Sequence, residues 1–352
     1  MVIISKKQQQ VLSLIIAQGT LFSSSEVYNA LQVTGDGQSL VTTKRLLSEM
    51  ATSGLLAVRG AGPSTAYTVS SLGRLMADVD IQAYCAVEPD KRHGLASYNF
   101  DLLGAIPPDI FLDSEQHIVE SATTEYQKRT ADSPPAIRKK ELERLIIELS
   151  WKSSKIEGNT YTLLDTEKLI LEGREAPGHS KEEAVMILNH KNAFTFIYQH
   201  KNDFKSFSRS NLETVHALLV KDLSVGIGLR KKPVGILGSK YKPLDNVHQI
   251  TDAVENLAHI IAKMETPYAR ALVALLGISY IQPFEDGNKR TSRLMANALL
   301  MAHDCAPLSY RSVDEADYRE AMLVFYELNS LIPIKRIFIE QYDFAARNYA
   351  VK

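Results

Sequence analysis

One short stretch, IQPFEDGNKRTSR (residues 281–293), brings together two carboxylates, a glycine, an asparagine and three cations. It lies between one apolar helical pattern, ARALVALLGISYI, and the start of another, TSRLMANALLM. Gly287 permits a turn with positive φ that points successive backbone N–H groups into a concavity. The helix that follows adds the positive end of its dipole, so the turn is suited to binding a phosphate group.

The charged side chains around this glycine fit the same chemistry. Lys289 and Arg290 add positive charge at the rim of the turn, and Arg290 and Arg293, three residues apart, project from nearly one helix face. Asp286, just before the turn, is placed to hold a hard cation such as Mg²⁺ that bridges phosphate oxygens. Phe284 is expected to anchor the loop in the core. For the Asp-Gly-Asn triplet alone, a solvated turn between two helices is the competing interpretation.

A second carboxylate occurs at the end of an amphipathic helical pattern far upstream. On a helical wheel, Ser153 lies in the middle of the apolar face and Glu157 at its edge; the face is formed by Leu142, Leu145, Ile146, Leu149 and Ile156. Gly158 predicts the end of the helix, so Glu157 lies in the last turn, where the helix dipole disfavours negative charge. A partly buried anion there requires a cation, and Arg293 is available. An ordinary exposed glutamate is the alternative.

The loop resembles the signature of the Fic (Fido) family, His-x-Phe-x-Asp/Glu-Gly-Asn-Gly/Lys-Arg-x-x-Arg. The matching residues are Phe284, Asp286, Gly287, Asn288, Lys289, Arg290 and Arg293. The resemblance covers about residues 139–343 and implies a helical domain that transfers AMP from ATP to a protein Ser, Thr or Tyr hydroxyl. It implies that Asp286 binds Mg²⁺ and that Arg290 and Arg293 hold the β- and γ-phosphates. The anion hole is then lined by Gly287, Asn288 and Lys289, and Tyr318 matches a family aromatic that touches the nucleotide.

The upstream pattern resembles a second motif of the family. Ser153-x-x-x-Glu157-Gly158 is similar to the inhibitory Ser/Thr-x-x-x-Glu-Gly/Asn, placed N-terminal to the loop as in one subclass. The resemblance implies an inhibitory helix at about residues 138–157. In it, Glu157 pairs with Arg293 and keeps the γ-phosphate of ATP from its productive position.

Gln282 departs from the family signature, because it stands where the family has its catalytic histidine. That histidine takes the proton from the attacking hydroxyl, whereas an amide can orient a hydroxyl but cannot accept its proton near neutral pH. Loss of a general base typically costs about 10²- to 10⁴-fold in rate. We therefore expect nucleotide binding to survive better than catalysis. Glu285, His216, His248 and His303 are conceivable bases, but the three histidines are expected to be structural.

The segment GLRKKPVGILGSKYKP differs from the helical patterns around it. Its glycines, prolines and short apolar runs predict a β-hairpin set into a helical domain. The resemblance implies that Leu229 to Lys242 is a flap that aligns a target peptide by strand addition. The residues expected to dock the target are Val234, Gly235, Ile236 and Leu237.

The N-terminal region has a pattern of its own, three helices followed by two strands. It resembles a winged helix-turn-helix, with Thr42 to Ser53 as the recognition helix and Gly60 to Ser64 as the tip of the wing. Lys44, Arg45 and Arg59 are then the expected contacts to duplex DNA. The region has six basic residues (Lys6, Lys7, Lys44, Arg45, Arg59, Arg74) against three acidic ones (Glu26, Asp36, Glu49), a net charge of +3. A protein-docking or dimerisation module is the alternative.

The whole chain of 352 residues has 40 basic and 41 acidic residues, which leaves a net charge of −1. This balance indicates neither a polyanion nor a membrane as a partner. The two isolated cysteines and the N-terminus, which does not read as a signal peptide, predict a cytoplasmic protein. We predict a mainly α fold: a Fic-type helical bundle with a β-hairpin flap, plus a small α+β winged-helix domain. The expected domains are 1–78 (winged helix), 79–134 (a connector packing on the body) and 135–348 (Fic domain).

Three interpretations of function remain open from the sequence. The first is an adenylyltransferase that uses ATP and Mg²⁺, is autoinhibited by Glu157 and is weakened by Gln282. In this interpretation the substrate that docks on the flap is another protein or the protein itself, and the protein can be a homodimer. The second is a nucleotide-binding regulator that controls a DNA-binding head. The third is a phosphotransferase similar to the Doc toxins, against which the intact Gly287 argues because those toxins lack that glycine.

Overall fold

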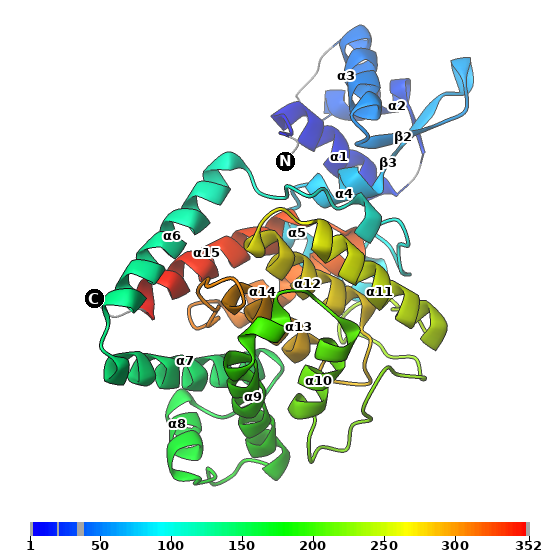
Figure 1. Ribbon diagram of the computed structural model, residues 1–352. Coiled ribbons are helices and arrows are strands. Elements are labelled where there is room, and N and C mark those ends of the chain that lie inside the picture. Colours follow the sequence, from blue (N-terminus) through cyan, green and yellow to red (C-terminus); the bar gives the residue numbers. More distant parts are fainter. Residues whose placement is uncertain (1–2, 20, 34–38, 350–352) are drawn as a thin grey trace. The chain divides into compact units, whose positions relative to one another are not determined.

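The computed structural model describes residues 3–19, 21–33 and 39–349, and the chain divides into two compact units. The smaller unit comprises Met1–Ile106, Gly235–Lys242 and Glu320–Lys335. The larger unit comprises Pro107–Val234, Pro243–Arg319 and Arg336–Lys352. Figure 1 labels the helices and strands of both units.

The smaller unit begins with helices α1 (Lys6–Gln18), α2 (Ser24–Val33) and α3 (Leu40–Thr52) and a three-stranded sheet. The strands, β1 (Phe22–Ser23), β2 (Leu56–Arg59) and β3 (Ala66–Val69), are ordered β1-β3-β2, and all pairs are antiparallel. The predicted strand pair therefore forms, in register from Leu56 opposite Val69 to Arg59 opposite Ala66. Asp36, counted in the charge of this region, lies outside the described residues.

The rest of the smaller unit consists of short helices and a buried polar cluster. The short elements are α4 (Ser71–Met76), α5 (Ile81–Cys85), η1 (Gly62–Ser64), η2 (Pro89–Lys91) and η3 (Leu103–Ala105). The carboxylate of Glu327 is buried and accepts hydrogen bonds from the Tyr84 hydroxyl at 2.6 Å and the Ser239 hydroxyl at 2.7 Å. Arg92 lies 3.6 Å from the same carboxylate. Residues 239–240 are therefore held by hydrogen bonds to Glu327 and not by pairing with a strand.

The β-hairpin predicted over residues 229–242 is wrong. All these residues are described, and none belongs to a strand; Lys242 alone forms an isolated bridge, with Ser97. Pro233 and Pro243 lack the N–H group that a ladder needs. The Ser239 N–H instead closes a turn on the Ile236 carbonyl at 3.0 Å, which leaves Leu237 fully exposed at its tip.

The larger unit is a helical bundle around α12 (Pro267–Ile281) and α13 (Asn288–Met301), which pack side by side. Helix α12 is apolar on every side, as expected of a helix at the centre of a core. Figure 1 shows these two helices with α7, α9, α10 and α11 around them. The other elements of this unit are α6 (Asp113–Asp132), α7 (Pro135–Ile156), α8 (Leu163–Glu172), α9 (Lys181–Gln199), η4 (Lys201–Phe204), α10 (Arg209–Leu219), α11 (Val247–Lys263) and most of α15 (Ile332–Asn348). Helix α14 (Glu315–Leu328) begins in the larger unit and continues in the smaller one from Glu320.

Helix α6 was not predicted from the sequence, where residues 79–134 were read as a mixed connector. The reason is that α6 is largely polar and buries only Val119, Ala122 and Thr123, so its helical periodicity is weak. Its position in the unit depends on tertiary contacts such as the buried hydrogen bond between Thr123 and Tyr268, 2.6 Å long. Among the described residues, no helix has both the length and the apolar character needed to cross a membrane.

Candidate nucleotide site

Two left-handed residues shape the turn between α12 and α13. Gln282 ends α12 at φ 51°, and Gly287 precedes α13 at φ 78°. A Cβ atom at position 287 would lie 3.4 Å from Val220 and 3.6 Å from His216, which are ordinary contacts, so it is the backbone conformation that favours glycine. The predicted positive φ at Gly287 is confirmed. The first N–H groups of α13 are thereby left facing the turn, as anion binding requires.

Asn288 and His216 hold the turn in this shape. The Asn288 amide accepts a hydrogen bond from the Phe284 N–H and donates one to the Phe284 carbonyl, both 2.8 Å long. Phe284 is buried and stacks on the His216 ring, with 3.7 Å between centroids and 6° between planes. His216 Nε2 donates to the Asp286 carbonyl at 3.0 Å. The predictions that Phe284 anchors the loop and that His216 is structural are confirmed.

Both buried histidines near the turn are uncharged at neutral pH. Burial lowers the pKa of His216 to about 4, although its bond to the Asp286 carbonyl opposes the shift. Burial lowers the pKa of His190 to about 3, and the nearby charges of Arg293 and Arg290 add to the effect. Neither histidine therefore competes with the arginines for an incoming anion.

At the edge of the site, the exposed Asp286 pairs with the buried Arg290. The Asp286 side chain is 65% exposed and accepts a hydrogen bond from Arg290 Nη2 at 3.0 Å. The Arg290 side chain is only 3% exposed. Its Nη1 is buried and has no hydrogen-bond partner among the described residues. A buried cationic donor without a partner is costly, so this nitrogen is an unused contact for an anion.

Arg293 lies at the bottom of the site and is fully buried. Its Nε donates to the Ser153 hydroxyl at 2.9 Å, its Nη2 to the Ser153 carbonyl at 2.8 Å, and its Nη1 to Glu157 Oε1 at 2.9 Å. The guanidinium also lies 5.7 Å from the centre of the Tyr318 ring, which is buried and packs edge-on against Tyr310. The ion pair predicted between Glu157 and Arg293 is confirmed as a contact.

Glu157 is charged in this position. Burial by itself raises the pKa of the Glu157 carboxyl, but Arg293 and Lys289 outweigh burial and hold the pKa below its usual value. Lys289 Nζ lies 3.5 Å from Glu157 Oε2, so the two carboxylate oxygens face different cations of α13. The negative charge of Glu157 thus neutralises cations that a phosphate group would otherwise meet.

The end of α7 is built to place Glu157. The Gly158 N–H bonds to the Lys155 carbonyl at 3.0 Å and the Asn159 N–H to the Ser154 carbonyl at 3.1 Å. This paired pattern, with Gly158 at φ 96°, is a Schellman motif, and it confirms the predicted helix end.

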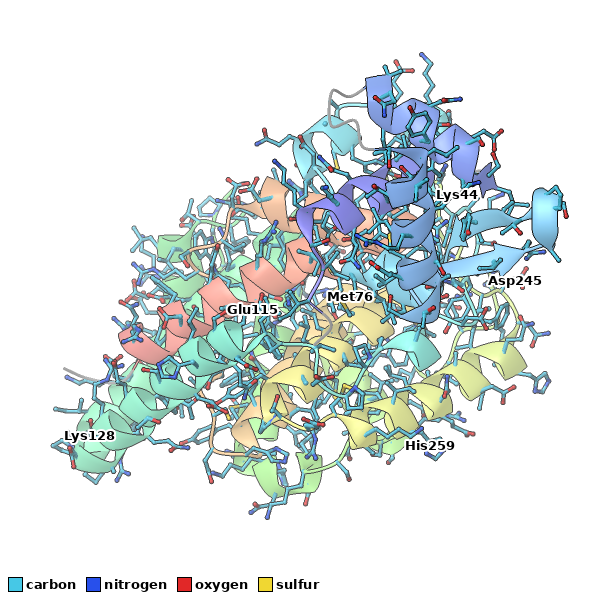
Figure 2. All side chains as sticks on the ribbon, turned by 90° about the horizontal axis from the view of Figure 1, so that it is seen from above. Lys44, Met76, Glu115, Lys128, Asp245 and His259 are labelled. Carbon is cyan, nitrogen blue, oxygen red and sulfur yellow. The ribbon has the colours of Figure 1, made fainter. Side chains whose placement is uncertain are left out.

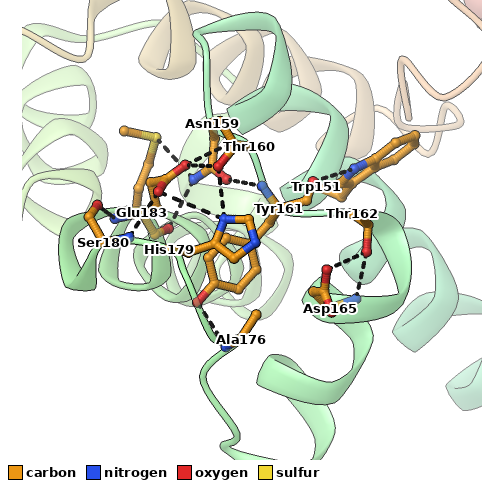
Figure 3. A network of polar contacts seen from close by, with 11 residues as sticks. Trp151, Asn159, Thr160, Tyr161, Thr162, Asp165, Ala176, His179, Ser180 and Glu183 are labelled. Carbon is orange, nitrogen blue, oxygen red and sulfur yellow. Dashed lines mark hydrogen bonds and ion pairs between the residues drawn. The ribbon is translucent and has the colours of Figure 1, made fainter.

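The turn after Gly158 is fixed by a polar network (Figure 3). The Thr160 N–H and hydroxyl both donate to Glu183 Oε1 at 2.7 Å. The Asn159 amide donates to the Glu183 carbonyl at 3.0 Å, and Trp151 Nε1 donates to the Tyr161 carbonyl at 3.1 Å. The C-terminus of α7 is thereby attached to the N-terminus of α9.

The Gln282 side chain folds back onto the last turn of α12. Its side chain is 6% exposed, and its Nε2 donates to the Ser279 carbonyl at 2.6 Å. Its backbone carbonyl accepts a hydrogen bond from Arg230 Nε, also at 2.6 Å. Arg230 was missed from the sequence. It is 2% exposed, and its own N–H donates to the Pro283 carbonyl at 2.9 Å. Nothing in Gly-Leu-Arg-Lys-Lys indicates which cation is buried.

The remaining predicted site residues lie elsewhere. Val234 belongs to the larger unit, whereas Gly235, Ile236 and Leu237 belong to the smaller unit. Lys44 and Arg45 are exposed on α3, where Figure 2 labels Lys44. Arg59 is exposed at the end of β2. Within the described part of the chain, no group of three or more His, Cys, Asp or Glu side chains could hold a metal ion.

Comparison with known proteins identifies the domain that contains this site. Residues 206–300 match the Fic/DOC family and form a Fic/DOC family domain. The chain is 23% identical over 199 residues to a protein adenylyltransferase, fic-1, of Caenorhabditis briggsae, and 26% identical over 174 residues to a protein adenylyltransferase, Fic, of Nematostella vectensis. These matches cover 55% and 48% of this chain but only 39% and 41% of the relatives. The chain thus spans about two fifths of the length of these relatives.

Solved structures share the fold. Fic-1 of Caenorhabditis elegans (residues 134–508) superposes with a TM-score of 0.59 at 18% identity, covering 67% of this chain and 72% of that one. A Fic family protein of Desulfovibrio desulfuricans superposes with a TM-score of 0.57 at 20% identity, covering 69% of this chain and 75% of that one. The mainly helical bundle is therefore a Fic fold.

Proposed function

We propose that this protein is a Fic-type adenylyltransferase whose nucleotide site is held back by Glu157 and whose chemistry is slow because of Gln282. The observation that carries the proposal is the arrangement at α13. A left-handed glycine, an exposed aspartate and a buried arginine with an unused donor surround one turn, beside an arginine that is paired with Glu157. The relatives named protein adenylyltransferase support this choice of reaction.

The α13 turn would hold the triphosphate of ATP. The backbone N–H groups after Gly287 and the unpartnered Nη1 of Arg290 donate to phosphate oxygens. The residues present also fit Mg²⁺: the Asp286 carboxylate is exposed and supplies one ligand, so phosphate oxygens and water must supply the others, as is usual for this ion. Bound there, Mg²⁺ would neutralise phosphate charge and orient the triphosphate.

Glu157 would act as the gate. The γ-phosphate needs Arg293, and the Glu157 carboxylate occupies one of its two terminal nitrogens. Breaking the pair leaves a buried charge on one side, so displacement is costly unless the incoming phosphate replaces the lost contacts. ATP can therefore bind in the presence of Glu157, but with its γ-phosphate away from Arg293.

Gln282 would limit the chemical step. In AMP transfer the hydroxyl oxygen of the target attacks the α-phosphorus, pyrophosphate leaves, and the hydroxyl proton must be taken up. Gln282 cannot take it, and its amide is already bonded to the Ser279 carbonyl. Positioning and charge neutralisation still supply part of the acceleration. We further propose that the protein substrate, or the protein itself, docks on the turn that carries Gly235, Ile236 and Leu237, where exposed Leu237 offers an apolar contact.

A second candidate function is a nucleotide-dependent regulator. It is favoured by the orientation of Gln282 and by the exposed Lys44, Arg45 and Arg59 on a winged-helix head that binds duplex DNA. A Doc-like phosphotransferase is less well supported, because Gly287 is present and packs against Val220 and His216.

Calorimetric titration with ATP and Mg²⁺ tests the nucleotide site. We expect weak binding to the parent protein and at least tenfold tighter binding to Glu157→Gly, a gain of about 1.4 kcal/mol, because Arg293 becomes available to the γ-phosphate. Glu175→Gly, an exposed loop glutamate, is the matched control and should bind as the parent does. Absence of ATP binding in both the parent and Glu157→Gly would contradict the proposal.

A further inference from the structure

The larger unit contains a cavity of about 370 Å³ that is separate from the α13 turn. The residues that line it come mainly from α6, α7, the ends of α9 and α13, and the segments that follow α13 and α15. Its volume is within the range of small-molecule sites. Part of the lining is apolar and comes from Leu142, Leu145, Met301 and Pro307. The residues that bind the proposed nucleotide are not among those that line it.

Aromatic side chains form the walls. Tyr126, Tyr198 and Tyr349 line the cavity from α6, α9 and the residue after α15. Burial raises the pKa of Tyr126 to about 12, so it remains an uncharged phenol at neutral pH. The Tyr349 hydroxyl donates to Glu148, which fixes its ring. Such walls suit a flat ring or a branched apolar group.

Of the charged residues that line the cavity, one cation has no ion pair with a described residue. Lys201 pairs with Asp304 at 2.6 Å, and Glu141 pairs with Arg144 at 2.8 Å. Arg138 is exposed on α7, and its guanidinium forms no ion pair with any described residue. The lining therefore combines apolar side chains, three tyrosines and one exposed cation without an ion pair.

We propose that this cavity binds a small organic monoanion, a carboxylate carried on a single ring or a branched chain, with the carboxylate on Arg138. A guanidinium binds a carboxylate through two parallel hydrogen bonds. A neutral or cationic molecule of the same shape gains no such contact. Selectivity for the anion therefore distinguishes a specific binding site from an apolar cavity that binds any molecule of this shape.

A ligand in the cavity would contact α7, the helix that carries Glu157. Helix α7 lines the cavity with Leu142 and Leu145 and carries Ser153 and Glu157 further along. Leu145 and Ser153 are eight residues apart, which is about 12 Å along a helix. A shift of α7 toward or away from the ligand changes the Glu157–Arg293 contact, because α7 is continuous between them. This step rests on the proposed function.

The binding step is tested with benzoate as the probe, by calorimetry on the full chain. We expect the parent and Lys139→Gln, a neighbouring exposed lysine outside the cavity, to bind benzoate alike. Arg138→Gln should bind at least tenfold more weakly, and Ala131→Trp, which fills the cavity, should not bind. Benzamide, the neutral analogue, should bind more weakly than benzoate. No binding of millimolar benzoate to the parent, or equal binding by Arg138→Gln or of benzamide, overturns the proposal.

The coupling step compares ATP affinity with and without saturating benzoate. We expect at least a threefold change in Kd for ATP in the parent and none in Glu157→Gly, where no gate remains. The coupling is overturned if benzoate binds but leaves the Kd for ATP of the parent unchanged, or if it changes the Kd for ATP equally in both proteins. If ATP binds to neither protein, the adenylyltransferase proposal fails, whereas the benzoate titrations still decide whether the cavity is a site.

Discussion

At the scale of single residues, the proposed function depends on two features of the α12–α13 turn: the groups that could donate to a phosphate, and the amide at Gln282. Arg290 keeps an unused buried donor, and Asn288 and His216 hold the turn as a functional loop requires. Gln282, in contrast, is bonded to Ser279 and is nearly buried. Retention of the binding groups with loss of the proton acceptor fits a protein in which nucleotide binding is easier than catalysis.

The two buried histidines make stability depend on pH. His190 and His216 have pKa values of about 3 and about 4 in the folded protein, against an ordinary value of about 6.5. Between pH 6.5 and 4 the unfolded chain binds protons that the folded chain does not. Stability is therefore full above pH 6.5 and falls as the pH falls, by about 1.4 kcal/mol per pH unit for each histidine.

Urea unfolding at pH 7 and pH 5 measures this effect. Each histidine should contribute about 2 kcal/mol to the loss between the two values. His216→Gln should reduce the loss by that amount. His259→Gln, an exposed histidine on α11 labelled in Figure 2, should leave it unchanged. A pH-dependent loss that is the same in His216→Gln and the parent contradicts the assignment.

Some of these contacts could be predicted from the sequence and others could not. The position of Glu157 at the edge of an apolar helix face is a local pattern, whereas its pairing with Arg293 was implied by the resemblance to the inhibitory motif. Arg230 could not be predicted, because its burial depends on the carbonyls of Gln282 and Pro283, about fifty residues away. The packing of His216 on Phe284 is equally non-local.

At the scale of elements, α7 links several features of the larger unit. Its last turn carries Ser153 and Glu157, and the Schellman motif at Gly158 fixes where that turn ends. Lys152, on the same helix, pairs with Glu315 at the start of α14, the helix that also carries Tyr318. Helix ends are readable from glycine and capping residues, so α7 could be predicted closely. The segment 229–242 could not, because its N–H groups bond to a turn and to Glu327 instead of a strand.

Helix α3 is the element on which DNA binding depends. If Lys44 and Arg45 contact phosphates, the affinity of the full chain for a 20-bp duplex falls as the salt concentration rises. In Lys44→Gln/Arg45→Gln, the negative slope of log K against log salt should become less steep by about 1.8, because two phosphate contacts are lost. Gel shifts over a salt series measure this. Lys139→Gln/Lys140→Gln, an exposed pair on α7, is the control. Absence of any gel shift at low salt would indicate that the N-terminal region, residues 1–78, is a protein-docking module.

At the scale of the whole molecule, residues 206–300 form a Fic/DOC family domain, most of which belongs to the larger, helical unit, and the smaller unit contains a helix-and-sheet pattern of its own. The proposed function gives the larger unit a nucleotide site with two restraints, one at Glu157 and one at Gln282. If each restraint alone is enough to suppress the reaction, removing either one changes little. Removing both should change the rate by more than the product of the single effects, because the two residues act on one step.

The most direct test is therefore protein labelling from ATP with the Glu157→Gly/Gln282→His double variant, using α-labelled and γ-labelled ATP in parallel. We predict that the parent and both single variants label weakly, and that the double variant labels itself or an added protein from the α label only. Adding Asp286→Ala or Arg290→Ala should abolish that labelling, because both residues hold the triphosphate. A parent that labels as fast as the double variant, a double variant that binds ATP but stays inert, or transfer of the γ label would each contradict this account.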